Sequence, residues 1–155
     1  MRGVYTLIIR SAQSRRIRVG GRVLVFKKGL YLYTGSALGR GPTSLERRIS
    51  RHLGRRKRNF WHIDRVLSSS SLRVVSVVFA NTTSKMECKV NTALLKESGI
   101  RVLARGIGSS DCRCESHFLT ARCTSVVLQR RVRSCYIELG LRPRTLEDHT
   151  LGLAD

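Results

Sequence analysis

Three stretches of the chain constrain its fold most, because they carry the β-branched and aromatic residues typical of buried strands. They cover about residues 3–10, 30–34 and 72–80. Between the first two stretches, Gly20-Gly21 is flanked by two shorter strand-like runs, a pattern that predicts a β-hairpin. Helical patterns follow each of the last two stretches. We therefore expect an α/β protein of the α+β type, with a small mixed central β-sheet flanked by helices and a hairpin near the N-terminus.

The clearest helix of the sequence follows a glycine-rich loop at about 39–42. Leu45, Ile49 and Leu53 recur at a four-residue spacing, which places them on one face of a helix. Thr43 and Ser44 are both candidates for the N-cap, because each offers a side-chain oxygen to the first free N–H groups. We expect this apolar face to pack against the sheet.

The length of 155 residues suits a single domain covering residues 1–155. We expect a core at 3–95 and a C-terminal extension at 100–140 that contains two short strands and a basic helix. We expect the last residues, 141–155, to form a frayed tail.

The charge of the chain points to an anionic partner. There are 30 Lys and Arg residues against 10 Asp and Glu, a net charge of +20 that repels itself unless anions lie against it. Nucleic acid supplies a dense row of phosphates, so we expect DNA as the partner, with RNA as the alternative. The longest apolar stretch, 74–80, has only the length of a strand, which argues against a membrane partner. Without a signal-peptide cleavage pattern, we expect a cytoplasmic, nucleoid-associated protein.

Basic residues gather on the predicted helix and on the turn that follows it. Arginine outnumbers lysine in the chain by 24 to 6, and its planar guanidinium suits two-point contacts with phosphate. The residues that we expect to bind the nucleic-acid backbone are Arg47, Arg51, Arg55, Arg56, Lys57 and Arg58.

Two tyrosines lie next to glycine in the strand-like stretches, in Gly3-Val4-Tyr5 and in Tyr33-Thr34-Gly35-Ser36-Ala37. In the helix that follows, Arg48 precedes an apolar residue, and His52 lies four positions after Arg48. Glu87 lies within the first turn of a later helical pattern at about 84–97, after the third strand. Together these segments resemble the GIY-YIG nuclease superfamily over residues 3–95.

The resemblance implies a nuclease fold and assigns roles to particular residues. Arg48 takes the place of the catalytic arginine, His52 that of an accessory histidine, and Glu87 that of the single carboxylate that binds Mg²⁺ or Mn²⁺. The tyrosines of the two signatures, Tyr5 and Tyr33, complete the expected catalytic set, and Gly35 and Ser36 are possible accessory residues.

This chain departs from the superfamily pattern in three respects. An extra hairpin separates the two tyrosine signatures. The isoleucine of the signatures is Val4 in the first and Thr34 in the second, and the late asparagine of the family is not obvious. Segments including Trp61-His62-Ile63-Asp64 and 108–117 resemble an archaeal branch whose members occur alone or fused to endonuclease III-type glycosylases.

The resemblance implies a divalent-metal-dependent endonuclease that hydrolyses phosphodiester bonds in DNA, in repair or on selected DNA structures. The residue types suit this chemistry without the family. Tyr5 or Tyr33 could position or deprotonate water, Arg48 could hold the phosphate, and Glu87 could hold the cation. The alternative is a non-catalytic basic nucleic-acid-binding protein, in which the tyrosines pack in the core and Glu87 interacts with its helix dipole.

Histidine and cysteine residues outside this set allow two interpretations each. His62 is either a satisfied, partly buried histidine or a proton shuttle or phosphate ligand. The second group either forms a tetrahedral zinc site or belongs to a buried, thiol-rich loop in which Asp111 caps a turn. The residues of this group are Cys88, Cys112, Cys114 and His117.

Overall fold

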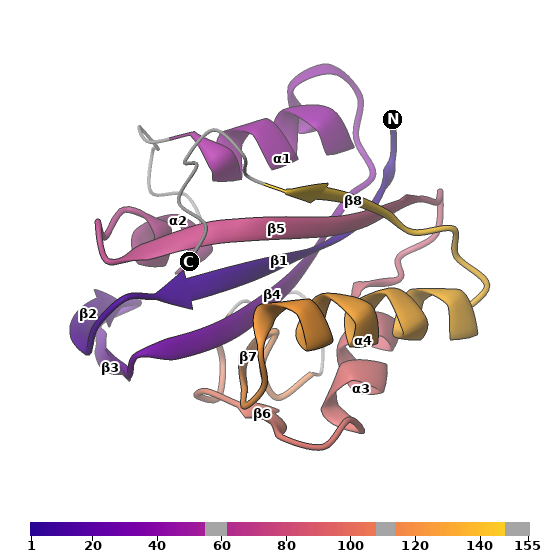
Figure 1. Cartoon of the computed structure of the whole chain (residues 1–155). Helices are drawn as coiled ribbons and strands as arrows, with labels where there is room; N and C mark the ends of the chain where they lie inside the picture. Colours follow the sequence, from indigo (N-terminus) through magenta and orange to yellow (C-terminus); the bar gives the residue numbers. More distant parts are fainter. Residues whose placement is uncertain (55–61, 108–113, 148–155) are drawn as a thin grey trace.

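The computed structural model describes residues 1–54, 62–107 and 114–147. Its main sheet has six strands in the order β6-β7-β4-β1-β5-β8 (Figure 1). The α+β fold with a central sheet and flanking helices is confirmed, but every strand pair of this sheet is antiparallel, where the sequence predicted a mixed sheet. The strands are β1 (Gly3–Ser11), β4 (Gly29–Ala37), β5 (Leu72–Asn81), β6 (Ile100–Val102), β7 (Phe118–Ala121) and β8 (Arg144–Glu147).

The sheet is buried on both faces by helices. The helices are α1 (Leu45–Leu53), α2 (His62–Leu67), α3 (Glu87–Leu95) and α4 (Ser125–Glu138), with a short 3-10 turn at Gly41–Thr43. The first two pack on one face and the last two on the other (Figure 1). No helix within the described ranges is both long and apolar enough to cross a membrane.

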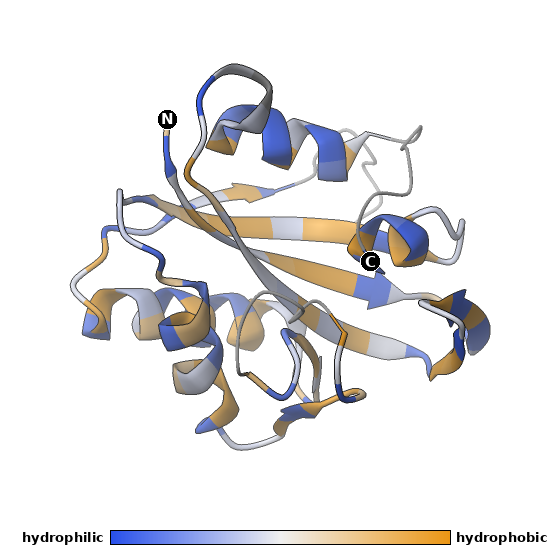
Figure 2. Ribbon diagram, turned by 180° about the vertical axis from the view of Figure 1, so that it is seen from behind, coloured by the Kyte–Doolittle hydropathy of each residue, from blue (hydrophilic) through white to orange (hydrophobic). Residues whose placement is uncertain are grey.

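β1 lies at the centre of the sheet and supplies side chains to both cores. Tyr5, Leu7 and Ile9 point into the core under α1 and α2, whereas Val4 and Ile8 point into the core under α3 and α4. This alternation follows from the two-residue period of a strand. Figure 2 shows the resulting run of hydrophobic residues along the central strands.

The predicted hairpin and first helix are confirmed. β2 (Arg15–Val19) and β3 (Arg22–Phe26) pair across Gly20 and Gly21. Both glycines have a positive φ, of 56° and 76°, as a two-residue hairpin turn requires. Leu45 and Ile49 of α1 are buried against the sheet and Leu53 is partly buried there. Of the two candidate caps, Ser44 is the one that accepts a hydrogen bond from the backbone N–H of Arg47.

The C-terminal segment is part of the same sheet and core. β7 pairs with β4, and the Tyr136 hydroxyl of α4 contacts Thr6 of β1 at 2.9 Å and the Val78 carbonyl of β5 at 3.1 Å. The prediction of a frayed tail is wrong for Arg144–Glu147, because these residues form β8 and pair with β5. The rest of the predicted tail, 148–155, lies outside the described residues.

Candidate active site

The second tyrosine signature lies where β4 extends beyond its neighbour β7. β7 pairs with β4 only over Leu30–Tyr33. Within the described residues, the segment from Thr34 to Ala37 therefore has the β1 strand on one side only. The carbonyls of Thr34 and Ser36 lie on the same edge, because backbone groups alternate sides along a strand. Side chains reach both carbonyls: His117 Nδ1 lies 3.2 Å from Thr34 O, and Arg48 Nη1 donates to Ser36 O at 3.2 Å.

Tyr5 is packed beneath this edge and forms a hydrogen bond with His52. Its hydroxyl lies 2.9 Å from His52 Nε2, and both side chains are almost fully buried. The Tyr33 ring lies beside both, with centroid distances of 6.5 Å to Tyr5 and 6.4 Å to His52. The predicted catalytic residues Tyr5, Tyr33 and His52 are therefore brought together.

The glycines of the two signatures have a packing role. A Cβ on Gly35 would lie 2.5 Å from the Tyr5 hydroxyl oxygen, so only glycine lets that hydroxyl cross over β4. A Cβ on Gly3 would collide with the carbonyl of Ala80 on β5 and lie 2.8 Å from a methyl group of Leu45 on α1. Each glycine thus permits a close approach that an alanine would prevent.

The environment of Tyr5 makes it a weak acid. Burial raises the pKa of Tyr5 well above its usual value, and the neighbouring Tyr33 adds to the increase. The Arg48 guanidinium acts in the opposite direction, through its charge and a side-chain hydrogen bond, but does not offset burial. Arg48 by itself therefore does not make the Tyr5 phenol a usable base, and the phenol stays protonated at neutral pH.

Arg48 and Glu87 meet at Ser36 although they come from opposite faces of the sheet. Arg48 lies on α1 and Glu87 begins α3. The Ser36 hydroxyl donates to Glu87 Oε2 at 2.6 Å, and the Ser36 carbonyl accepts from Arg48 at 3.2 Å. All three residues are only partly buried. The positively charged Arg48 and the carboxylate of Glu87 are thus both held by Ser36, at an accessible edge of the sheet.

Arg51 has a contact that the sequence did not predict. Its Nη2 donates to Asp64 Oδ2 at 2.9 Å, and Asp64 is fully buried on α2. The ion pair ties α1 to α2. Arg47, in contrast, is exposed on α1, as a backbone-binding residue must be.

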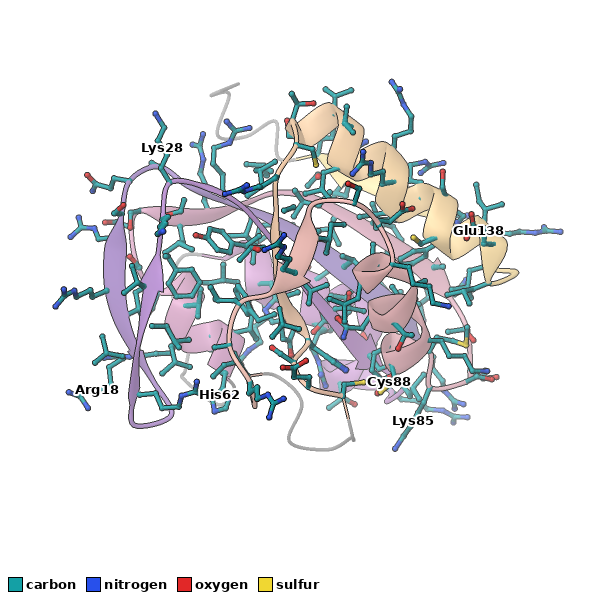
Figure 3. All side chains as sticks on the ribbon, turned by 90° about the horizontal axis from the view of Figure 1, so that it is seen from below. Arg18, Lys28, His62, Lys85, Cys88 and Glu138 are labelled. Carbon is teal, nitrogen blue, oxygen red and sulfur yellow. The ribbon has the colours of Figure 1, made fainter. Side chains whose placement is uncertain are left out.

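Other predicted residues lie at the hairpin or outside the described ranges. His62 begins α2 and lies against the hairpin, where a Cβ on Gly20 would be 2.9 Å from His62 Nε2 (Figure 3). This placement fits a partly buried histidine that packs against the hairpin. The predicted residues outside the described ranges are Arg55, Arg56, Lys57, Arg58, Cys112 and, in the cap prediction, Asp111.

A second polar cluster lies beside Glu87. The ligand atoms of Cys88, Cys114 and His117 all lie within 4.8 Å of one another, and Cys88 Sγ is 3.7 Å from His117 Nε2. Burial lowers the pKa of His117, although the Thr34 carbonyl and Glu87 favour the protonated form. Its imidazole is therefore neutral at neutral pH.

Three contacts at the site carry little local signal in the sequence. They are the ion pair of Asp64 with Arg51, the Thr34 carbonyl contact with His117, and the hydrogen bond from Asn91 to the Ser116 carbonyl at 2.7 Å. Asn91 is buried on α3 and holds the segment that leads into His117. The one available signal was its position four residues after Glu87, which places both on the same helix face.

The fold and the site together define an α+β protein with a polar, partly accessible site at the edge of an antiparallel sheet. A family model described as "Domain of unknown function DUF123" matches residues 4–139, most of the chain, and the chain belongs to this family. The match includes β6, β7 and α4. No curated protein and no solved structure matches the chain.

Proposed function

We propose that this protein is a divalent-metal-dependent endonuclease that hydrolyses phosphodiester bonds in DNA. The observation that carries the proposal is the linked set around Ser36, in which Arg48 and Glu87 meet beside the buried Tyr5–His52 pair. Phosphodiester hydrolysis needs positive charge for the phosphate and a means to stabilise the leaving oxygen. At one accessible edge of the sheet, Arg48 and Glu87 are suited to these two needs, and both contact the same residue, Ser36.

Arg48 is the proposed phosphate-binding residue. Its guanidinium carries five N–H donors in a planar fork, so it can contact a phosphate while it holds the Ser36 carbonyl. The contact with β4 fixes the position of the positive charge before the substrate arrives. A preorganised charge is worth more in the transition state than one that must reorient.

Glu87 is the proposed ligand of Mg²⁺ or Mn²⁺. The Ser36 hydroxyl donates a hydrogen bond to one carboxylate oxygen of Glu87 and so orients the carboxylate. The Glu87 side chain is only partly buried. This fits a hard cation, which is often held by one or two carboxylates while water and phosphate oxygens fill the other positions. When bound, the cation supplies Lewis-acid stabilisation of the charge that develops on the phosphate and on the leaving oxygen.

Tyr5 and His52 are proposed as positioning residues rather than as groups that touch the substrate. Both are nearly fully buried, and the phenol of Tyr5 is too weak an acid to act as a base at neutral pH. Their hydrogen bond and the contact of Tyr5 with Arg48 fix α1 over β1 and β4. Tyr33 remains our candidate for orienting water.

Incubation with labelled DNA and RNA of several structures, with and without Mg²⁺ or Mn²⁺, tests the function directly. We expect cleavage of at least one DNA substrate, dependent on the metal and abolished by chelation. Binding without cleavage of any substrate would support the alternative, a non-catalytic nucleic-acid-binding protein.

DNA binding is expected to depend strongly on salt. The net charge is +20, and the exposed positions of the hairpin include Arg15, Arg16 and Arg18. If basic residues neutralise about six phosphates, affinity falls by about 10³-fold between about 50 and 200 mM salt, because counterion release is lost. Titrations at several salt concentrations measure this slope. A flat response would show that the charge serves another purpose.

A further inference from the structure

The cluster of Cys88, Cys114 and His117 has the spacing of a metal site. In a tetrahedral zinc site, with Zn–S and Zn–N bonds of about 2.3 and 2.1 Å, the sulfur and nitrogen ligands lie roughly 3.6 Å apart. Cys88 Sγ and His117 Nε2 are 3.7 Å apart, and no ligand atom of the cluster is farther than 4.8 Å from another. The three ligand atoms are therefore close enough for small side-chain movements to bring all of them onto one ion.

The orientation of His117 also suits a metal ligand. Its Nδ1 lies 3.2 Å from the Thr34 carbonyl, so a proton on Nδ1 can be donated to that oxygen. This tautomer leaves the lone pair on Nε2, the atom that lies 3.7 Å from Cys88 Sγ. Metal-bound histidines generally use their second nitrogen in this way, which fixes the ring and its tautomer.

The three residues come from segments that are distant in the chain. Cys88 lies in the first turn of α3, Cys114 lies in the segment before β7, and His117 immediately precedes β7. Asn91, one turn further along α3, is buried and donates to the Ser116 carbonyl. The same helix thus contacts the same segment twice.

We propose that Cys88, Cys114 and His117 bind a zinc ion that fastens α3 to the segment before β7. Two thiolates and an imidazole are soft and borderline ligands, which suit zinc and do not suit Mg²⁺ or Ca²⁺. Three protein ligands leave one tetrahedral position for a fourth ligand. Figure 3 shows Cys88 on α3, and Glu87 is its neighbour in the chain.

The zinc site goes beyond the proposed nuclease function and does not depend on it. It would, however, hold the first turn of α3, from which Glu87 reaches Ser36, and His117 contacts β4 only two residues before Ser36. Zinc therefore has a structural role beside the edge, separate from the cation that Glu87 would bind.

Metal analysis of the purified full-length chain is the first test. Protein prepared without chelators or metal-affinity resin is dialysed against metal-free buffer, and its metals are measured by mass spectrometry. We expect about one zinc per chain. Protein without zinc, or with Cys88 and Cys114 joined in a disulfide, would overturn the proposal.

Variants locate the ion. Cys114→Ser and His117→Ala should lose the zinc, whereas Cys123→Ser should keep it, since Cys123 is a free cysteine outside the cluster. If either cluster variant binds as much zinc as the parent, the assignment is wrong.

Two measurements on the parent protein keep the test valid if the variants fail to fold. Cobalt substituted for zinc should show a thiolate-to-metal charge-transfer band and the visible bands of a tetrahedral site. Chelation should lower the melting temperature by about 10 °C, and added zinc should restore it, because ion binding stabilises only the folded state. A cobalt spectrum without thiolate bands, or a melting temperature indifferent to chelation, would contradict the site. Mg²⁺-dependent DNA cleavage is measured separately, so failure of the zinc site and failure of the nuclease proposal are distinguishable.

Discussion

Glu87→Gln is expected to abolish DNA cleavage while DNA binding stays nearly intact. The amide oxygen of glutamine can still accept the Ser36 hydroxyl, so the local geometry at the edge of β4 is preserved. What is lost is the negative charge that a hard cation prefers in its ligand. Removing a negative charge also does nothing to weaken attraction for phosphate. We expect cleavage to fall by at least about 10²- to 10³-fold.

Cleavage under saturating protein and a parallel binding assay measure the effect of Glu87→Gln. Glu138→Gln is the matched control, because Glu138 is exposed on α4 (Figure 3). The control should cut at the parental rate. If Glu87→Gln also cuts at the parental rate, Glu87 does not bind the metal and another carboxylate must be tested.

Arg48→Ala belongs to the same experiment and should also abolish cleavage. Loss of one preorganised charge at the transition state costs roughly 3–4 kcal/mol, or about 10²- to 10³-fold in rate. Binding should weaken only modestly, because 29 other Lys and Arg residues remain of the 30 in the chain. Arg47→Ala, exposed on the same helix, is its control: affinity should fall slightly and the saturated rate should not. If both substitutions lowered the cleavage rate equally, Arg48 would have no specific role in the transition state.

Arg51→Ala is expected to destabilise the fold, by about 3–5 kcal/mol. Its partner Asp64 is fully buried, and removing the arginine takes away the 2.9 Å ion pair that compensates this charge in the interior. Since 1 kcal/mol changes the melting temperature of a protein of this size by roughly 2–4 °C, a decrease of at least about 6 °C follows.

Thermal unfolding of Arg51→Ala beside Arg47→Ala measures the difference. Exposed Arg47 should change stability by no more than about 0.5 kcal/mol. The double variant Arg51→Met, Asp64→Leu should regain much of the loss, because apolar side chains often replace a buried ion pair without cost. Unchanged stability of Arg51→Ala, combined with weakened DNA binding, would show that Arg51 contributes to nucleic-acid binding and not to the stability of the fold.

The elements with a strong local pattern were the ones predictable from the sequence. The four-residue spacing of Leu45, Ile49 and Leu53 predicted α1 and its buried face. Gly20-Gly21 predicted the hairpin, because two adjacent residues with positive φ are needed there. Both features depend on neighbours a few residues apart, so the information needed to recognise them is contained in a short segment.

β8 could not be predicted in the same way. Arg144–Glu147 carries only weak strand character of its own and is mostly exposed. It becomes a strand because the edge of β5 offers backbone partners from Ser76 to Phe79. That edge exists only once the chain has folded, which is why the segment resembled a tail.

The candidate site shows the same difference between what a local sequence pattern predicts and what depends on the folded structure. Residue types and spacing selected Tyr5, Arg48 and Glu87 as candidates, and the resemblance to a nuclease superfamily suggested their roles. That the phenol is too buried to be a base, and that Arg51 neutralises a buried carboxylate, depends on the surroundings of each group.

By itself, the sequence determined the helices and strands with strong periodicity, the high positive charge and the identity of the polar residues available for chemistry. The tertiary structure alone decided which of these residues meet. Ser36 and Glu87 are 51 positions apart and Cys88 and His117 are 29 apart, yet each pair is in contact. The pKa of a group and its capacity to hold a metal depend on atoms within a few ångströms, and those neighbours come from distant segments that only folding brings together.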